Sequence, residues 1–268
     1  MRLIPLQDSQ TAGLWSARYI AERIRAFDPG QDRPFVLGLP TGSTPLIAYR
    51  ELIRLHREEG LSFRHVITFN MDEYVGFNAR HTRSYRTFMD ENLFRHINIP
   101  ADNIHFLDGG ATDLDAECQR YENCISAVGG IHLFFGGVGH NGHIAFNEPG
   151  SSLHSRTRLK TLAMNTRQAN ARFFENDMDQ VPEQALTVGT GTIMDADEVL
   201  ILATGSDKAR AVKAAVEDPV NHMWTISVLQ LHARALLVCD DAATLDLTLR
   251  TLRYFESVEA EHIRKWIT

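Results

Sequence analysis

One glycine-rich segment, residues 131–150, carries side chains that could move protons. Its first part, Ile131–Phe135, is apolar without alternation, which is typical of a strand covered on both faces in a parallel sheet. Glycines at positions 136, 137, 139 and 142 then let the backbone turn tightly or approach a ligand. Beyond them, His143 could act near neutral pH, and Glu148 could orient it or share its work. A connection whose histidine only forms a hydrogen bond is the plain alternative.

The loop after a second apolar run, Phe35–Leu39, has the composition of a phosphate site. Thr44 suits the N-cap and Pro45 the first position of the helix that follows, so free N–H groups and the positive end of its dipole would face the loop. The loop lacks the lysine of a nucleotide P-loop, which argues against triphosphate chemistry. An ordinary strand–turn–helix cap is the alternative. The loop residues are Thr41, Gly42, Ser43 and Thr44.

Two adjacent acids, Asp72 and Glu73, follow a third strand candidate, His65–Phe69. Ligands bind at the carboxyl ends of strands in open parallel sheets, so either acid is a candidate general base. Because successive side chains diverge, we expect only one of them to face a site. The alternative is that the pair caps the next helix.

Three cations, Arg156, Arg158 and Lys160, stand at every second residue and would share one face of an extended segment. Like charges repel each other unless an anion or an acidic partner lies between them. This basic stripe therefore predicts a second anion site. A solvated edge strand blunted by charge is the alternative.

Two further cations lie near expected turns. Arg172 falls within residues 162–184, a segment that could form a lid, exclude water and supply a charged clamp. Lys208 ends the turn Thr204–Lys208, just where the helix Ala209–Val216 begins. A lysine in a first helical turn opposes the dipole, so a bound anion explains it better than helix stability does. A tolerated surface lysine is the alternative.

Seven apolar segments alternate with helical stripes, which predicts one α/β domain over residues 1–268: an open, mostly parallel, Rossmann-like sheet with helices on both faces. Helices are expected over residues 11–27, 45–55, 84–96, 113–128, 166–174, 209–216, 245–255 and 259–266. The candidate ligand groups follow strands, so we expect them to meet at one edge of the sheet. The strand candidates are Leu3–Leu6, Phe35–Leu39, His65–Phe69, Ile131–Phe135, Ala185–Gly189, Val199–Ala203 and Ala235–Cys239.

The bulk composition argues against several classes of protein. A net charge of -7 gives no footprint for nucleic acid, and no run of about 18 apolar residues suggests a membrane span. The apolar start, Met1–Leu6, is too short for a signal peptide. Three cysteines without metal-ligand spacing indicate reduced thiols, and the histidines show no helical pairing. We therefore expect a cytoplasmic protein that binds no metal.

A phosphate cradle beside a carboxylate and a His/Glu pair suits proton transfer on a small phosphorylated substrate, and sugar phosphates fit best. At these residues the chain resembles the glucosamine-6-phosphate deaminases, also called glucosamine-6-phosphate isomerases, over essentially its full length. Together the matching segments are highly specific, whereas the glycine loop alone would not be. They are Leu39–Pro45, Phe69–Gly76, Gly142–Pro149, Ser151–Leu153 and Arg156–Thr161.

The resemblance implies a reaction: glucosamine 6-phosphate and water give fructose 6-phosphate and ammonia, without a cofactor, in amino-sugar catabolism. In that scheme His143, assisted by Glu148, opens the sugar ring, and Asp72 removes the proton at C2. The enolic intermediate is reprotonated at C1 before ammonia leaves. The 41–44 loop, Arg172 and Lys208 would hold the phosphate.

The allosteric members of that family are similar to this chain as well. This resemblance implies a homohexamer activated by N-acetylglucosamine 6-phosphate, with a neighbouring subunit completing the activator site. The matching residues are Met1, Ser151, Ser152, Arg158, Lys160, Thr161 and Tyr254.

One position departs from the family pattern. Many relatives have aspartate directly before Gly142, whereas this chain has Asn141. An amide oxygen can accept a hydrogen bond from the imidazole of His143, but it cannot stabilise the imidazolium with a full charge. We therefore expect weaker ring opening, or a larger share of it for Glu148.

Two alternative functions fit the same residues. A 6-phosphogluconolactonase on a related scaffold would hydrolyse a lactone, and ammonia release separates it from a deaminase. A sugar-phosphate sensor with catalysis weakened through Asn141 would not need a base at C2, so the role of Asp72 distinguishes it from an enzyme.

Overall fold

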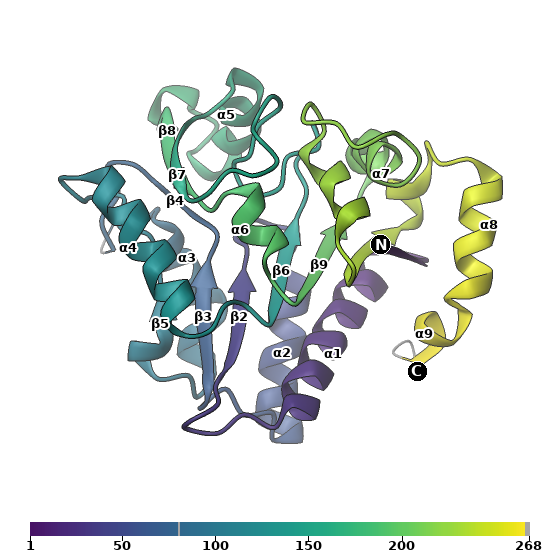
Figure 1. Cartoon of the computed structure of the whole chain (residues 1–268), viewed down its shortest axis with the longest axis horizontal. Helices are drawn as coiled ribbons and strands as arrows, with labels where there is room; N and C mark the ends of the chain where they lie inside the picture. Colours follow the sequence, from purple (N-terminus) through teal and green to yellow (C-terminus); the bar gives the residue numbers. More distant parts are fainter. Residues whose placement is uncertain (80, 266–268) are drawn as a thin grey trace.

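A parallel sheet of seven strands forms the centre of the computed structural model, which describes residues 1–79 and 81–265 (Figure 1). The first strand, β1, lies at one edge; from β2 onwards the chain builds the sheet outwards from its middle, with β2, β3 and β5 on one side and β6, β9 and β10 on the other. The carboxyl ends of β2 and β6 therefore flank the switch point where such sheets bind ligands. In spatial order the strands are β1 (Arg2–Leu6), β10 (Ala235–Asp240), β9 (Glu198–Ala203), β6 (Leu133–Gly137), β2 (Phe35–Leu39), β3 (Val66–Asn70) and β5 (Ile104–His105).

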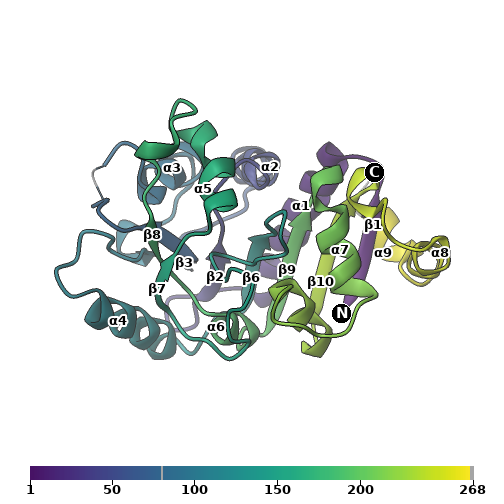
Figure 2. The same ribbon diagram turned by 90° about the horizontal axis from the view of Figure 1, so that it is seen from above.

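Side chains alternate between two apolar cores, one on each face of the large sheet. Within β9, Leu200 and Leu202 belong to one core and Val199 and Ile201 to the other. Strands covered on both faces need no polar alternation, which explains their uniformly apolar sequences. The first core packs against α1 (Ser9–Phe27), α2 (Leu46–Glu59) and α3 (Tyr85–Asn92), and the second against α4 (Leu114–Ala127), α6 (Thr190–Met194) and α7 (Ala209–Val216), as Figure 2 helps to follow. The predicted open parallel α/β fold is confirmed.

One strand prediction was wrong: the run Ala185–Gly189 does not join the parallel sheet. Its strand β8 (Gln184–Thr187) lies between β4 (Asp72–Tyr74) and β7 (Arg158–Thr161) in a small antiparallel sheet. The run is apolar on both faces because Leu186 packs into one large core while Ala185 packs into a third apolar cluster. The seventh parallel strand is instead β5, which has only two residues and therefore no readable pattern.

Two helices, those expected over residues 84–96 and from residue 245, also have boundaries that differ from the prediction. The helix expected over residues 84–96 ends at Asn92 and is followed by a 3₁₀ turn, η1 (Phe94–His96). The helix expected from Leu245 begins at Leu249, because Thr248 caps it by accepting from Thr251 N at 3.3 Å. This helix is α8 (Leu249–Val258), and α9 (Ala260–Lys265) follows it. Trp266, expected in the last helix, lies outside the described residues.

The segment expected to form a lid holds α5 (Met164–Asn170) and two 3₁₀ turns, η3 (Ala171–Phe173) and η4 (Met178–Gln180). The third apolar cluster joins it to the small sheet, since Phe174 packs with Tyr74 and Phe146. The other 3₁₀ turns are η2 (Ala101–Asn103), η5 (Ser206–Lys208), η6 (Thr225–Leu231) and η7 (Asp241–Thr244). Across residues 1–79 and 81–265, no helix has the length and apolarity that crossing a membrane requires.

Candidate active site

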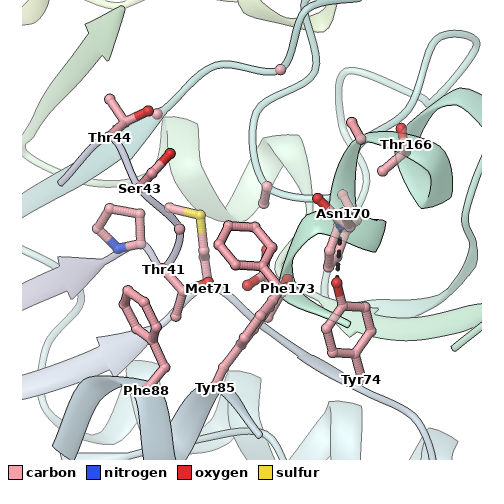
Figure 3. A pocket seen from close by; sticks show the side chains of 18 of the residues that line it. Thr41, Ser43, Thr44, Met71, Tyr74, Tyr85, Phe88, Thr166, Asn170 and Phe173 are labelled. Atoms are coloured by element: carbon pink, nitrogen blue, oxygen red, sulfur yellow. Dashed lines mark hydrogen bonds between the residues drawn. The ribbon is translucent and has the colours of Figure 1, made fainter. Parts of the chain in front are cut away.

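A cavity of about 330 Å³ opens where β2, β3 and β6 end, and its volume suits a small ligand. The lid segment covers one side of it: Figure 3 shows Ser43 and Thr44 on one side and Thr166 and Asn170 of α5 on the other. Most of the side chains singled out from the sequence therefore meet here. The cavity wall contains the loop 41–44, Asp72, His143, Arg172 and Lys208.

The loop 41–44 turns sharply between β2 and α2. Gly42 has a φ of 94°, a left-handed conformation that suits glycine. The helix begins one residue later than expected: Pro45, not Thr44, is the N-cap, and no side chain caps the helix. The loop hydroxyls line the cavity beside an uncapped helix terminus, an arrangement that favours a bound anion.

Two cations reach the same part of the cavity. Arg172, on η3 of the lid segment, donates from Nη2 to Ser43 Oγ at 3.4 Å. Lys208 lies at the end of η5, directly before α7 rather than in its first turn, and its Nζ is 2.8 Å from Asp207 Oδ2. Together with the loop, these side chains form a positively charged end of the cavity.

Asp72 is a buried carboxylate in the cavity wall, with 5% exposure. Within residues 1–79 and 81–265, no hydrogen bond or ion pair engages its oxygens. Burial raises the pKa of Asp72 well above its ordinary value, and the neighbouring Glu73 raises it further. An unpaired carboxylate with a raised pKa has the basicity that proton abstraction requires.

Glu73 points the other way, as the alternation of side chains along a strand predicts. Its carboxylate accepts from the backbone N–H groups of Tyr74, Tyr85 and Arg86 at 2.9, 3.0 and 3.2 Å, so it caps the start of α3. Burial raises its pKa to about 7, although these three N–H groups lower it. Of the two adjacent acids, one faces the cavity and the other fixes a helix.

His143 stands between the cavity and two polar side chains behind it. Its Nδ1 is 3.6 Å from Glu148 Oε2, which is an ion-pair distance but too long for a hydrogen bond. Burial raises the pKa of Glu148, but His143, Thr166 and Asn141 together outweigh burial and lower it to about 2. Glu148 is therefore an anion that can stabilise a protonated imidazole.

Asn141 contacts the carboxylate and not the imidazole, contrary to expectation. Its Nδ2 donates to Glu148 Oε2 at 2.9 Å, because an ionised carboxylate is the better acceptor for an amide N–H. Three buried atoms of this group have no hydrogen-bond partner among the described residues: Asn141 Oδ1, His143 Nδ1 and Glu148 Oε1. Buried polar atoms are normally paired; of these three residues only His143 lines the cavity, so its imidazole is the group that a ligand in the cavity can reach.

Two glycines let residues 136–148, named the catalytic loop for their expected role, pack this tightly. A Cβ atom on Gly139 would lie 2.3 Å from Cε1 of His143, so the ring rests directly on the backbone. Gly142 has a φ of 80°, and a Cβ there would lie 2.4 Å from Trp224 Cε3. The glycine spacing noted in the sequence thus reflects close approach on both sides of the loop.

Several cavity residues were missed in the sequence, among them His140, Thr166 and Asn170. His140 shares the wall with His143 and Lys208; burial lowers the pKa of His140, and these two neighbours lower it further. Thr166 and Asn170 reach the cavity from α5, and Asn170 Nδ2 donates to Tyr74 Oη at 2.9 Å. His140 was detectable from its place in the glycine loop, whereas the α5 residues depend on how the lid segment docks.

The three cations of the basic stripe differ in their contacts: Arg156 has acidic partners, whereas Arg158 and Lys160 have none among the described residues. Arg156 contacts Glu122 at 2.6 Å and also pairs with Asp195, so it meets the acidic partners that like charges require. Arg158 donates from Nη1 to Asn147 Oδ1 at 2.9 Å. Burial lowers the pKa of Arg158 and of Lys160, and Arg158 lowers that of Lys160 further. Arg158 and Lys160 therefore remain as the cations available for an anion.

The other residues matched to an activator site do not all meet within one chain. Ser151 and Ser152 lie in the loop that leads to β7, the strand of Arg158 and Lys160. Met1 precedes the edge strand β1, and Tyr254, 61% exposed, lies on α8 at the opposite end of the sheet in both ribbon views (Figures 1 and 2). Nor do the described residues contain three or more His, Cys, Asp or Glu side chains grouped to bind a metal.

Comparisons with known proteins agree with this arrangement. Residues 8–238 match the family described as glucosamine-6-phosphate isomerases/6-phosphogluconolactonase. Glucosamine-6-phosphate deaminases from Tolumonas auensis and Proteus mirabilis are each 61% identical over 266 residues, which cover 99% of this chain and 100% and 99% of theirs. A solved monomeric glucosamine-6-phosphate deaminase has a TM-score of 0.88 at 39% identity and covers 92% of this chain and 100% of its own.

A more distant structure shows how far the fold extends. The 6-phosphogluconolactonase of Trypanosoma brucei has a TM-score of 0.72 at 21% identity and covers 92% of this chain and 98% of its own, a likeness that concerns the fold alone. The chain therefore belongs to the family of glucosamine-6-phosphate isomerases and 6-phosphogluconolactonases. Its 61% identity to full-length deaminases places it among the glucosamine-6-phosphate deaminases of that family.

Proposed function

We propose that this chain converts glucosamine 6-phosphate and water into fructose 6-phosphate and ammonia. One observation carries the proposal: the unpaired, buried carboxylate of Asp72 shares a cavity with His143 and with a cationic, hydroxyl-lined loop. A sugar phosphate bound by that loop would place its other end beside the proton-transfer groups. The 61% identity to glucosamine-6-phosphate deaminases supports the same reaction.

The phosphate is held at the cationic end of the cavity. Hydroxyls of Thr41, Ser43 and Thr44 and the start of α2 donate hydrogen bonds, while Arg172 and Lys208 supply charge. Because Arg172 belongs to the lid segment, phosphate binding would also fix that segment over the cavity. Closure excludes water and strengthens each electrostatic contact inside.

Ring opening is the task of His143. Its imidazole moves a proton between the ring oxygen and the anomeric oxygen, and the Glu148 anion 3.6 Å away stabilises the imidazolium during transfer. Asn141 keeps Glu148 oriented through the 2.9 Å hydrogen bond. A neutral amide adds no charge, so Glu148 carries the electrostatic part alone.

Asp72 then takes the proton from C2 of the open-chain sugar, and the electrons of that C–H bond form the enolic double bond between C1 and C2. Reprotonation at C1 leaves an imine at C2, to which water adds, and the nitrogen departs as ammonia. The burial of Asp72 makes it a stronger base, and the ammonium group of the substrate favours its ionised form. Positioned bases of this kind contribute roughly 10²–10⁴-fold to the rate.

We further propose a homohexamer activated by N-acetylglucosamine 6-phosphate in the cytoplasm. Arg158 and Lys160 supply cations with lowered pKa values for the activator phosphate, next to Ser151, Ser152 and Thr161. Met1 and Tyr254 lie at the far end of the sheet, so only a neighbouring copy could bring them to this site. A hyperbolic rate curve that does not respond to the activator would refute the regulatory part.

A coupled assay of purified protein tests the catalytic proposal. We expect ammonia and fructose 6-phosphate in equal amounts from glucosamine 6-phosphate. Hydrolysis of 6-phosphogluconolactone in place of deamination would indicate the lactonase alternative, and binding of the amino sugar without turnover would indicate a sensor. Light scattering of the same preparation would show whether it is a hexamer.

A further inference from the structure

Asn147 links the basic stripe to the loop of His143: its side chain bonds to Arg158 and to the backbone of Ile144, the residue after His143. Its side chain is fully buried, with 0% exposure, and it directly precedes Glu148 in the chain. Neither the phosphate site nor the proton-transfer group described above includes it.

Both the nitrogen and the oxygen of the Asn147 side-chain amide form hydrogen bonds. Its Nδ2 donates to Ile144 O and Val188 O, each at 2.9 Å, which ties the residue after His143 to the end of β8. Its Oδ1 accepts from Arg158 Nη1 at 2.9 Å and from Ser155 Oγ at 3.3 Å. One buried side chain thus joins the catalytic loop to the basic stripe.

The loop that Asn147 holds has a strained backbone. Ala145, in the cavity wall, has a φ of 51°, which residues with a Cβ atom rarely adopt. Such a conformation persists only where surrounding contacts enforce it. Asn147 bonds to Ile144 on one side of Ala145, and Thr225 Oγ1 donates to Asn147 O at 2.9 Å on the other.

We propose that Asn147 is a positioning residue, which holds His143 and Glu148 in their relative geometry and connects them to Arg158. An anion that draws the Arg158 guanidinium towards itself removes a hydrogen bond from Asn147 Oδ1 and changes how firmly the loop is held. Binding of an anion at the basic stripe then changes the positions of His143 and Glu148 through the side chain of Asn147. The identity of the reaction and of the activator rests on the proposed function, whereas the hydrogen bonds of Asn147 do not depend on it.

Asn147→Asp gives a sharp test, because it keeps the shape and the acceptor for Arg158 but removes both N–H donors to the loop. We expect kcat to fall by about 10- to 100-fold with little change in KM, since small displacements of reacting groups cost this much. The pH profile of kcat should shift as well, and it should also shift in the uncharged Asn147→Leu, in which no new carboxylate can cause the shift. A folded Asn147→Asp variant with wild-type kcat and pH profile overturns the proposal.

Asn103→Asp is the matched control. Asn103 Nδ2 also donates to a backbone carbonyl, Val66 O at 3.0 Å, but at the amino end of β3, away from the cavity. We expect wild-type kinetics from this control. Equal losses in both variants would assign the effect to general destabilisation and contradict the proposal.

Arg158→Met tests the other end of the contact, also if Asn147→Asp does not fold. It removes the donor to Asn147 Oδ1 and leaves the loop itself unchanged. We expect a shift of basal kcat and of its pH profile without any activator, and a double variant less impaired than the product of the single losses, since both act through one contact. Unchanged basal kinetics, or losses that multiply, contradict the proposal.

An NMR titration of the His143 imidazole separates this inference from the proposed function, because it needs no turnover. Absence of ammonia release by the wild type would refute the deaminase reaction only. A displaced His143 midpoint in the uncharged Asn147→Leu, which lacks the same hydrogen bonds but adds no carboxylate, supports the positioning role in either case, and an unchanged midpoint in that variant overturns it.

Discussion

Asp72 combines burial with the absence of a hydrogen-bond partner among the described residues, and both properties bear on pH. Its folded-state pKa is raised by burial and by Glu73, so its carboxylate is protonated over a wider pH range than an ordinary aspartate. A protonated Asp72 cannot accept the C2 proton. We expect kcat/KM to decrease as pH falls through this raised pKa, measured as ammonia release across acid to alkaline pH. An acid limb at the ordinary aspartate pKa would contradict this.

The same carboxylate should cost stability. Its pKa is higher in the folded than in the unfolded state, so its contribution to the free energy of unfolding is lost as pH rises from the ordinary aspartate value through the raised one. Asp72→Asn should therefore raise the free energy of unfolding by about 1–3 kcal/mol at the upper end of that pH window, and Tm should rise with it. Turnover should fall by roughly 10²–10⁴-fold. Ligand affinity should persist. The exposed Asp102→Asn is the control, and a lower Tm for Asp72→Asn would count against this account.

The residue at position 141 determines whether the group around His143 contains one carboxylate, that of Glu148, or two. Asn141→Asp would place a second carboxylate where Nδ2 now lies, 2.9 Å from Glu148 Oε2. Two carboxylates at this distance share a proton, so the pKa of Glu148 should rise from about 2, and the acid limb of the rate profile moves to higher pH once the pKa of the pair exceeds that of Asp72. At neutral pH the added charge should stabilise the imidazolium and raise turnover severalfold. Profiles identical to the wild type would show that this position does not matter.

At the scale of elements, the catalytic loop is held by contacts that only small residues allow. Trp224 packs against Gly142, and Ile226 N and Thr225 Oγ1 bond to Gly142 O at 2.9 and 3.3 Å. The segment leading into η6 therefore supports the loop from behind. On the cavity side, the imidazole of His143 lies against the backbone at Gly139.

Gly139→Ala should displace His143, because the added Cβ would lie 2.3 Å from the ring. We expect kcat to fall by on the order of 10²-fold, as for a misplacement near 1 Å, with the fold retained. Gly30→Ala is the control, since nothing lies within 4 Å of a Cβ there. Full activity in Gly139→Ala would mean that the loop adjusts and that the close packing is not required.

On the scale of the whole molecule, the two ends of the sheet have different tasks. The carboxyl ends of the strands carry the cavity, whereas the amino end of β9 carries a buried ionic group around Glu198. Glu198, 3% exposed, accepts from Tyr19 Oη at 2.9 Å, pairs with Arg23 at 2.7 Å and also with Arg234. This group joins α1 to the sheet far from the reaction.

Glu198→Ala should therefore lower stability without changing catalysis. It leaves two partly exposed arginines without their partner, and we expect a loss of about 1–3 kcal/mol, less than for fully buried charges because solvent screens both. Thermal unfolding and the ammonia assay measure the two effects. A change in kcat or KM at a temperature where the variant is folded would show that the two ends are coupled.

The fold was predictable where a local sequence pattern indicates burial. Uniformly apolar runs such as Val199–Ala203 and Ala235–Cys239 predicted strands covered on both faces, and the structure pairs them in parallel. The run Ala185–Gly189 has the same pattern but pairs antiparallel in the small sheet. An apolar pattern reports that a strand is covered; it does not report which strand lies beside it.

By itself, the sequence determined the parallel fold and the loops at strand ends that hold Asp72, His143 and residues 41–44, because periodicity and turn residues are local properties. Only the tertiary structure decided that Asn141 bonds to Glu148, that Arg156 is neutralised by Glu122, and that Asn147 meets Arg158. Such contacts depend on how the elements dock. Side-chain partners are chosen by distance and burial in the packed molecule, which no short stretch of sequence contains.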